Sequence, residues 1–186
     1  METIPAHGGT LINRELTGVE RETLLERVPT LPSMPLRPRE ISDLEMIANG
    51  AFSPLDGFMC EDDYTAVRGN MHLASGLAWT IPITLSASDD FASSLKEGAD
   101  IALYAGDDHL LGVLHLKQKY RYDKQREAER VYLTTETAHP GVAALYEQGD
   151  WLLGGSISLL NRPRNSAFPA FRLDPRQTRH AFKKKG

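Results

Sequence analysis

The chain has 186 residues, of which 41% are hydrophobic and 25% are charged, and this composition is ordinary for a globular protein. The length suits one well-packed domain, or one domain and part of another. A net charge of −4 at pH 7 argues against non-specific nucleic-acid binding, which depends on a basic face. The single cysteine, Cys60, excludes an internal disulfide framework and favours a reducing cytoplasm.

Neither secretion nor membrane insertion is indicated. The first ten residues, METIPAHGGT, lack the basic region and apolar core of a signal peptide. The longest apolar stretch, GLAWTIPITL, is too short and too interrupted to span a bilayer. We therefore expect a cytoplasmic protein without membrane contact.

Three helices are predicted in the first 70 residues. Residues 17–28 have apolar side chains at near-helical spacing, with Thr17 as a possible N-cap: Val19, Leu24, Leu25 and Val28. Residues 61–69 open with acids, which the helix dipole favours at that end. Between these two helices, four prolines in residues 29–38 predict extended or turning chain.

The third helix is predicted over residues 39–50. Ser42 or Asp43 can cap its start, and Gly50 fits the position after its end.

The stretch NGAFSPLDGFM (49–59) combines three turn signals with large apolar side chains: Phe52, Leu55, Phe58 and Met59. We interpret it as a packed loop whose turns direct these side chains into the core or into a domain interface. The alternative is direct substrate contact through Ser53 or Asp56. The packed loop is favoured, because a sulfate or phosphate site needs cations or clustered N–H groups and this stretch has no cation.

Strands dominate the middle of the chain. Residues 78–86 are rich in β-branched side chains, and residues 100–106 and 109–122 form a hairpin pattern around a short loop. Residues 150–160 are strand-like, with a glycine pair at 154–155 that is typical of a bulge.

Two helical segments interrupt these strands. Residues 123–132 predict a charged helix or turn, and residues 139–149 predict a helix with Pro140 in its first turn. The predicted strands and helices follow one another without a regular βαβ alternation. They predict an α+β domain with a small curled β-barrel or mixed sheet and short flanking helices.

The last residues carry a complete set of helix signals. Residues 161–173 are irregular and read as a linker. Asp174 can cap the helix that follows, Pro175 fits its first position, Lys183 to Lys185 fill its last turn, and Gly186 ends it. We expect this helix to open a second unit.

The stretch GAFSPLDGFM (50–59) resembles the N-terminal segment of ATP sulfurylases, also called sulfate adenylyltransferases. Five further segments resemble the same family and occur in the family's order: HGGTLINR (7–14), WTIPITL (79–85), DKQREAERVYLTTETAHPGV (123–142), GDWLLGGSISLL (149–160) and FRLDPRQTRHAFKKKG (171–186). The chain departs from the family at one turn. The family has glycine before a Thr-Thr pair and aspartate after it, whereas Leu133 and Glu136 flank the pair here.

The resemblance implies a PUA-like N-terminal domain over residues 1–170. Residues 171–186 would be the linker and first helix leading to a nucleotidyltransferase domain that this chain lacks. The family's enzyme joins ATP and sulfate to give adenosine 5′-phosphosulfate and pyrophosphate, and it uses magnesium. The resemblance also implies a C-terminal catalytic domain as partner and a possible homo-oligomer.

The family's active-site signature is Gln-x-Arg-Asn-Pro followed by His-x-x-His, and it lies in the second domain. Gln177-Thr178-Arg179 matches its first three residues, but no Asn-Pro follows and no His-x-x-His is present. The resemblance therefore assigns no catalytic, cofactor-binding or metal-binding residue to this chain. ATP and magnesium are implied only for the full-length enzyme, and the chain alone is expected to be inactive.

The sequence gives only weak signals for a metal site, a reactive cysteine or RNA binding. No two of the six histidines have the i,i+4 spacing of a helical zinc site, and the single cysteine also disfavours structural zinc. Cys60 lies beside an acidic run, which disfavours a reactive thiolate. The alternative function is a stand-alone PUA-like module that binds RNA or another protein. RNA binding would require a basic groove with exposed aromatic side chains, which the acidic balance disfavours.

Overall fold

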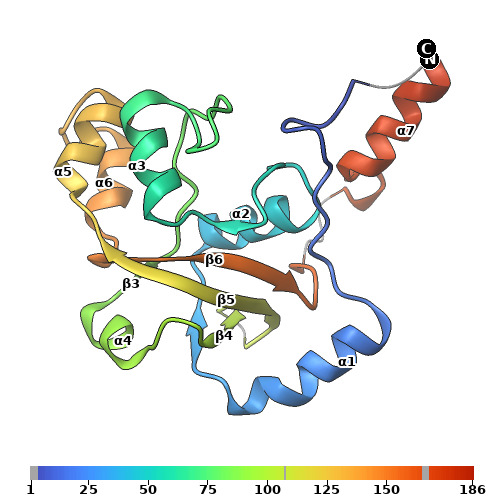
Figure 1. The fold of residues 1–186 in the computed structure, drawn as a ribbon, viewed down its shortest axis with the longest axis horizontal. Coiled ribbons are helices and arrows are strands. Elements are labelled where there is room, and N and C mark those ends of the chain that lie inside the picture. The colour runs from blue at the N-terminus through green and yellow to red at the C-terminus, as the bar shows by residue number, and fades with distance from the viewer. Residues whose placement is uncertain (1–3, 107, 165–167) are drawn as a thin grey trace. The chain divides into compact units, whose positions relative to one another are not determined.

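The computed structural model describes residues 4–106, 108–164 and 168–186, and these form two compact units (Figure 1). The first unit comprises the described residues of 1–57, 100–115 and 156–186. The second unit comprises residues 58–99 and 116–155. Strands β5 (Leu110–Arg121) and β6 (Trp151–Leu159) each contribute to both units.

The described strands form one mixed sheet of six, in the order β1-β4-β5-β6-β2, with β3 also pairing with β6. Strand β1 is parallel to β4, whereas β4 and β5 are antiparallel. The shorter strands are β1 (Ser33–Pro35), β2 (Gly57–Phe58), β3 (Ser86–Ala87) and β4 (Asp100–Tyr104). The α+β, PUA-like class with a mixed sheet is confirmed. The barrel alternative is wrong for the described strands, because end strands of two and three residues give too little ladder for closure.

The helical elements of the first unit are α1 (Gly18–Arg27), the 3₁₀ turn η1 (Val28–Thr30), α2 (Pro38–Ala48), the 3₁₀ turn η3 (Pro169–Phe171) and α7 (Pro175–Lys185). Leu24 of α1 and Val28 of η1 belong to a core with Ala102, Val113 and Leu160. Helix α1 follows Thr17, as predicted, although the Thr17 side chain makes no capping hydrogen bond. Val19 was expected on its apolar face, but it is 77% exposed.

Helix α2 starts earlier than predicted. Pro38 occupies its first turn, and the N-cap residue is Arg37, whose backbone N–H donates to Glu40 at 2.8 Å. The proposed caps Ser42 and Asp43 are therefore wrong, because the helix starts at Pro38 and the Glu40 carboxylate accepts from both the backbone N–H and the guanidinium of Arg37. Gly50 ends the helix with φ +86°, as expected of a residue at that position.

The second unit contains four helices and one π-helical turn among its described residues: α3 (Glu61–Asn70), α4 (Asp89–Ser94), α5 (Lys124–Glu127), the π-helical turn η2 (Ala128–Tyr132) and α6 (Pro140–Tyr146). The hydroxyl of Tyr64 on α3 donates to the buried carboxylate of Glu127 at 2.8 Å. Burial and this carboxylate raise the pKa of Tyr64 far above its usual range, so the phenol stays neutral.

The strand predicted over residues 78–86 is largely wrong. Only Ala78 forms a bridge, to His72, and regular pairing starts at Ser86 in β3. Pro82 lies between them and has no N–H to donate to a ladder. The hairpin predicted over 100–106 and 109–122 is confirmed by the antiparallel β4–β5 pair.

Glycine 154 has a different role from the predicted bulge. A Cβ at this position would lie 2.6 Å from the Met59 carbonyl oxygen and 2.7 Å from Cys60 Cα. The glycine therefore permits a close approach of the 59–60 backbone to β6 within the second unit.

Leu133 ends η2 with a left-handed backbone, at φ +58° and ψ +19°, and its side chain is 84% exposed. The turn retains a conformation that glycine adopts without steric cost, although leucine occupies it. Leu133 therefore has a positive φ at the position where the similar family has glycine.

The apolar residues of the 49–59 stretch are largely buried. Leu55 is 7% exposed, and Phe58 and Met59 are each 2% exposed. Phe52 is half-buried. The packed-loop interpretation is confirmed for three of the four side chains. No described helix is both long and apolar enough to cross a membrane.

Burial predicts different costs for the two phenylalanines of this stretch. We expect Phe58→Ala to lower the free energy of unfolding by roughly 3–5 kcal/mol, because it empties a fully packed site. Phe52→Ala should cost about half as much, since its side chain remains partly in water. Urea unfolding followed by circular dichroism measures both. A Phe58→Ala loss smaller than that of Phe52→Ala would contradict the packing described here.

Candidate functional site

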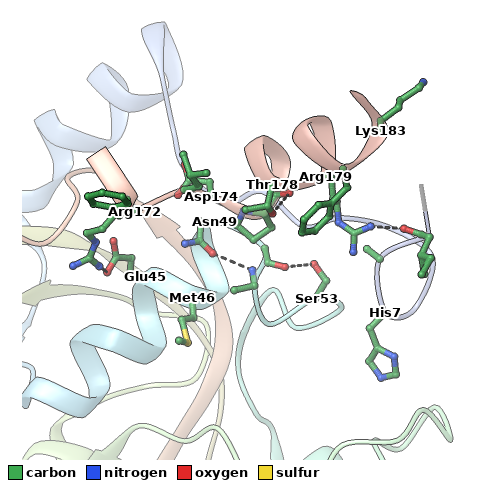
Figure 2. Close-up of a pocket in the computed structure, with 18 of the residues that line it drawn as sticks. His7, Glu45, Met46, Asn49, Ser53, Arg172, Asp174, Thr178, Arg179 and Lys183 are labelled. Carbon is green, nitrogen blue, oxygen red and sulfur yellow. Dashed lines mark hydrogen bonds and ion pairs between the residues drawn. The ribbon is translucent and has the colours of Figure 1, made fainter. Parts of the chain in front are cut away.

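A cleft of about 1160 Å³ lies in the first unit, lined by α7, the second half of α2 and residues near the N-terminus (Figure 2). Helix α2 contributes Glu45 and Met46, and the N-terminal segment contributes Ile4 and His7. Helix α7 contributes a row spaced by three and four residues: Pro175, Thr178, Arg179, Phe182 and Lys183. This spacing places the row on one face of the helix.

Ion pairs hold the walls of the cleft. Arg172 lies 3.1 Å from the Glu45 carboxylate, which joins the residues before α7 to α2. Arg162 lies 2.6 Å from Asp174 and 2.5 Å from Glu15. These carboxylates raise the pKa of Arg162 above its usual range, so it stays charged. Most of the charges in this part of the cleft are therefore already matched by the protein.

Gln177 and Arg179, which resemble part of the family's active-site signature, have structural partners. The Gln177 side-chain oxygen accepts a hydrogen bond from the Asp174 backbone N–H at 2.8 Å, completing the capping box of α7. Arg179 donates to the carbonyl of Ile4 (Figure 2). These contacts favour a structural role for both side chains.

Ser53 connects its loop to the N-terminal segment. Its Oγ accepts a hydrogen bond from the Ile12 N–H at 2.9 Å and donates to the Gly50 carbonyl at 2.7 Å. The side chain is buried, with 5% of its surface exposed. Asp56 has an exposed side chain, and its backbone carbonyl accepts from the Ile157 N–H at 3.0 Å. These contacts favour the structural interpretation of Ser53 over substrate contact.

Exposed apolar side chains are the other main feature of the cleft. Phe171 is 84% exposed, Phe182 is 65% exposed and Leu173 is 53% exposed. Helix α7 has no buried residue. Apolar groups ringed by charges are typical of an interaction surface rather than of an acid–base site.

Asp43 and Glu40 are buried carboxylates of α2. Burial raises the pKa of Asp43 to about 6, and Arg39, at 3.8 Å, opposes this shift. Neither carboxylate lines the cleft, so neither supplies it with a titrating group.

Sequence reasoning missed one polar network on the sheet of the first unit. His115 Nδ1 lies 2.6 Å from Asp100 Oδ1, and His115 Nε2 lies 2.9 Å from Ser158 Oγ. Arg27 donates to the other Asp100 oxygen at 2.7 Å. The order resembles a Ser-His-Asp triad, but Ser158 is only 5% exposed and Asp100 is also paired with Arg27. The arrangement links three neighbouring strands to α1.

The sequence offered one signal for this network, which was the predicted hairpin. Asp100 and His115 lie directly opposite each other on its two strands. Ser158 lies more than 40 residues further along the chain, so its pairing required the tertiary fold.

Within the described ranges, no group of three or more His, Cys, Asp or Glu side chains could hold a metal ion. Cys60 is half-buried and occupies the N-cap position of α3. The assignment of no catalytic, cofactor-binding or metal-binding residue to this chain stays a prediction.

The topology and the open mixed sheet define a PUA-like domain, and the family model for PUA-like domains matches residues 4–162. The chain belongs to this family. Over 185 residues, 100% of the chain, it is 48% identical to a sulfate adenylyltransferase of Synechococcus sp. and 50% identical to one of Trichormus variabilis. The predicted resemblance to sulfate adenylyltransferases is confirmed. The chain spans 47% of the length of these curated relatives.

A solved structure shares this fold. The hexameric APS kinase from Thiobacillus denitrificans matches the whole chain with a TM-score of 0.76 and 27% identity, over 32% of its own length. The family match at 4–162 lies inside the predicted domain of 1–170, whose end at residue 170 stays a prediction.

The Ser53 contacts generate a stability prediction. Ser53→Ala should lower the free energy of unfolding by about 1–3 kcal/mol, because it leaves the Ile12 N–H without its acceptor. Gly50→Ala should cost more, since its Cβ would lie 2.3 Å from the Ile12 carbonyl oxygen at a φ of +86°. Chemical denaturation measures both variants.

The control is Ser42→Ala, which changes an exposed serine that also lines the cleft and should alter stability by less than about 0.5 kcal/mol. Equal effects at Ser42 and Ser53 would contradict a structural role for Ser53.

Proposed function

We propose that this chain is the N-terminal PUA-like domain of a sulfate adenylyltransferase, an enzyme that converts ATP and sulfate to adenosine 5′-phosphosulfate and pyrophosphate. The observation that carries the proposal is the identity of 48–50% along the whole chain to sulfate adenylyltransferases about twice as long. Identity at this level over a full domain supports a shared fold and a shared place in the enzyme.

The domain supports catalysis rather than performing it. Its cleft contains ion pairs and exposed apolar groups. The ion-paired side chains of the cleft contact other residues of the protein and so stabilise the fold. Charge stabilisation at a transferring phosphoryl group requires cations aimed at the substrate. We therefore assign ATP and magnesium binding to a nucleotidyltransferase domain C-terminal to this region, and a structural role to the PUA-like domain.

Homo-oligomer formation and a cytoplasmic location are part of the same proposal. The similar APS kinase carries the description hexameric, which favours assembly in proteins that contain this domain. The single cysteine favours a reducing compartment.

A domain exchange tests the proposed function. This chain would replace the matched region of the Synechococcus sp. sulfate adenylyltransferase, and pyrophosphate release would be followed with ATP, sulfate and magnesium. We expect the chimera to turn over at a rate comparable to the unaltered enzyme, and the isolated chain to show no turnover. A folded but inactive chimera, or an active isolated chain, would overturn the proposal.

A variant of the same chimera separates support from catalysis. Gln177→Ala removes the side chain that resembles the catalytic signature and caps α7. We expect turnover to fall by only a few-fold, whereas loss of a transition-state contact typically costs about a hundredfold or more. A hundredfold loss in the folded chimera would assign Gln177 to catalysis.

The RNA-binding alternative is not favoured. Arg27, Arg121 and Arg162 form ion pairs with carboxylates, so they offer little free charge to a phosphate backbone. We expect no binding of single- or double-stranded RNA tighter than about 10⁻⁴ M at physiological salt, the weak end of non-specific binding. Fluorescence anisotropy with labelled RNA measures this. Micromolar, salt-sensitive binding that depends on basic residues outside 183–185 would favour the RNA module.

A further inference from the structure

Helix α7 is anchored to the first unit at its start. Its N-cap residue Asp174 pairs with Arg162 at 2.6 Å, and Arg172, just before it, pairs with Glu45 of α2 at 3.1 Å. The capping box between Asp174 and Gln177 holds the first turn at the same place. The base of the helix is therefore attached by charge to the segment after β6 and to α2.

The second half of α7 has no apolar packing to hold it. None of the helix residues is buried, and Phe182 is 65% exposed. Lys183, Lys184 and Lys185 are exposed, and they form no ion pair in the part of the chain that the structure describes. A helix of this length usually depends on an apolar face packed against the protein. The end of α7 is therefore held in place by a different kind of contact.

That contact joins the middle of α7 to the N-terminal segment. Arg179 donates a hydrogen bond to the backbone carbonyl of Ile4 (Figure 2). Among the described residues, no other hydrogen bond or ion pair connects the helix beyond its capping box to another segment. The accepting segment is itself held, because Ala6 is 8% exposed and its carbonyl accepts from the Gly9 N–H at 2.7 Å.

We propose that α7 is a hinged lid on the cleft, which pivots at Asp174 and is latched shut by the hydrogen bond from Arg179 to Ile4. In the closed state described above, Thr178 and Phe182 line the cleft together with the second half of α2. Breaking the latch leaves the anchored base in place and frees the end of the helix. The part of α2 that lines the cleft is then uncovered. This inference concerns the first unit alone and does not depend on the proposed function.

Opening of the lid disturbs little of the first unit. It breaks one charge-assisted hydrogen bond and exposes little apolar surface, so the closed state is favoured by a modest margin. Elements that move in proteins are typically those with few buried apolar contacts. The lid therefore opens and closes without unfolding the core of the unit.

Hydrogen exchange of the full chain measures this opening. Arg179→Ala removes the latch, and alanine favours a helix at least as well as arginine, so a loss of protection does not come from helix propensity. The freed end of a short helix frays. We expect the amides of residues 180–185 to exchange about tenfold faster or more, as loss of a charge-assisted hydrogen bond implies. The amides of α2 should keep their exchange rates.

The matched control is Arg176→Ala. Arg176 is an exposed cation of the same helix and forms no ion pair within the described ranges. We expect its removal to leave the exchange of residues 180–185 unchanged. Equal acceleration in the two variants would show a general effect of charge on the helix and would rule out a latch at Arg179.

Distances between spin labels locate the pivot. In a Cys60→Ser background, one label is attached at Glu22→Cys, an exposed position of α1. The second is attached at Lys185→Cys near the end of α7, or at Arg176→Cys near its start. We expect Arg179→Ala to shift and broaden the distance distribution to position 185, and to leave the distribution to position 176 unchanged.

Two results would contradict the lid. Unchanged distributions at both positions in the Arg179→Ala protein would show that the hydrogen bond to Ile4 is not a latch. Equal changes at both positions would show that α7 leaves the cleft as a whole, which excludes a pivot at Asp174. Thermal midpoints confirm that each variant is folded.

Discussion

The first unit depends on the close approach of the 50–53 turn to Ile12. Gly50 has no side chain to separate the two segments, and Ser53 closes the gap with a hydrogen bond to the Ile12 N–H. The residues that follow Ile12 are then held by hydrogen bonds to two other segments. The Arg14 N–H donates to the Ala48 carbonyl at 2.8 Å, and the Arg14 side chain donates to the Ile157 carbonyl at 2.7 Å. One turn thereby fixes the N-terminal segment against α2 and against β6.

This arrangement positions two walls of the cleft. The fixed N-terminal segment carries Ile4, whose carbonyl accepts from Arg179 of α7, and α2 carries Glu45, which pairs with Arg172. Polar contacts rather than apolar burial therefore hold α7 beside the cleft, since the helix buries none of its residues. Salt weakens such contacts more than it weakens a packed core. The position of α7 is consequently the part of the first unit that is most sensitive to solvent conditions.

The sequence predicted features that are set by neighbouring residues. The β4–β5 hairpin, the cap of α7 by Asp174 and the burial of Phe58 followed from turn signals, capping residues and apolar content. The predicted cap of α2 at Ser42 or Asp43 was wrong because a competing local signal lies earlier in the chain. Arg37 and Glu40 cap the helix there. Pro82 similarly limited the strand expected over 78–86.

Features that depend on distant residues could not be predicted. Ser158 meets His115 across 43 positions of sequence, and Gly154 is required by the backbone at residues 59 and 60 rather than by a bulge. In the candidate site, Gln177 and Arg179 matched part of the family's signature and were not assigned to catalysis, but only the fold showed that the Arg179 side chain contacts Ile4. Sheet closure is equally non-local, because it depends on how far the end strands extend.

Leu133 shows that this sequence is not at its stability optimum. A left-handed backbone costs a residue with a Cβ about 1–2 kcal/mol relative to a right-handed one, and an 84% exposed side chain recovers little of this through burial. Natural proteins tolerate such positions as long as total stability stays above the level that function requires. The turn after η2 is thus a place where an engineer could gain robustness without altering the core.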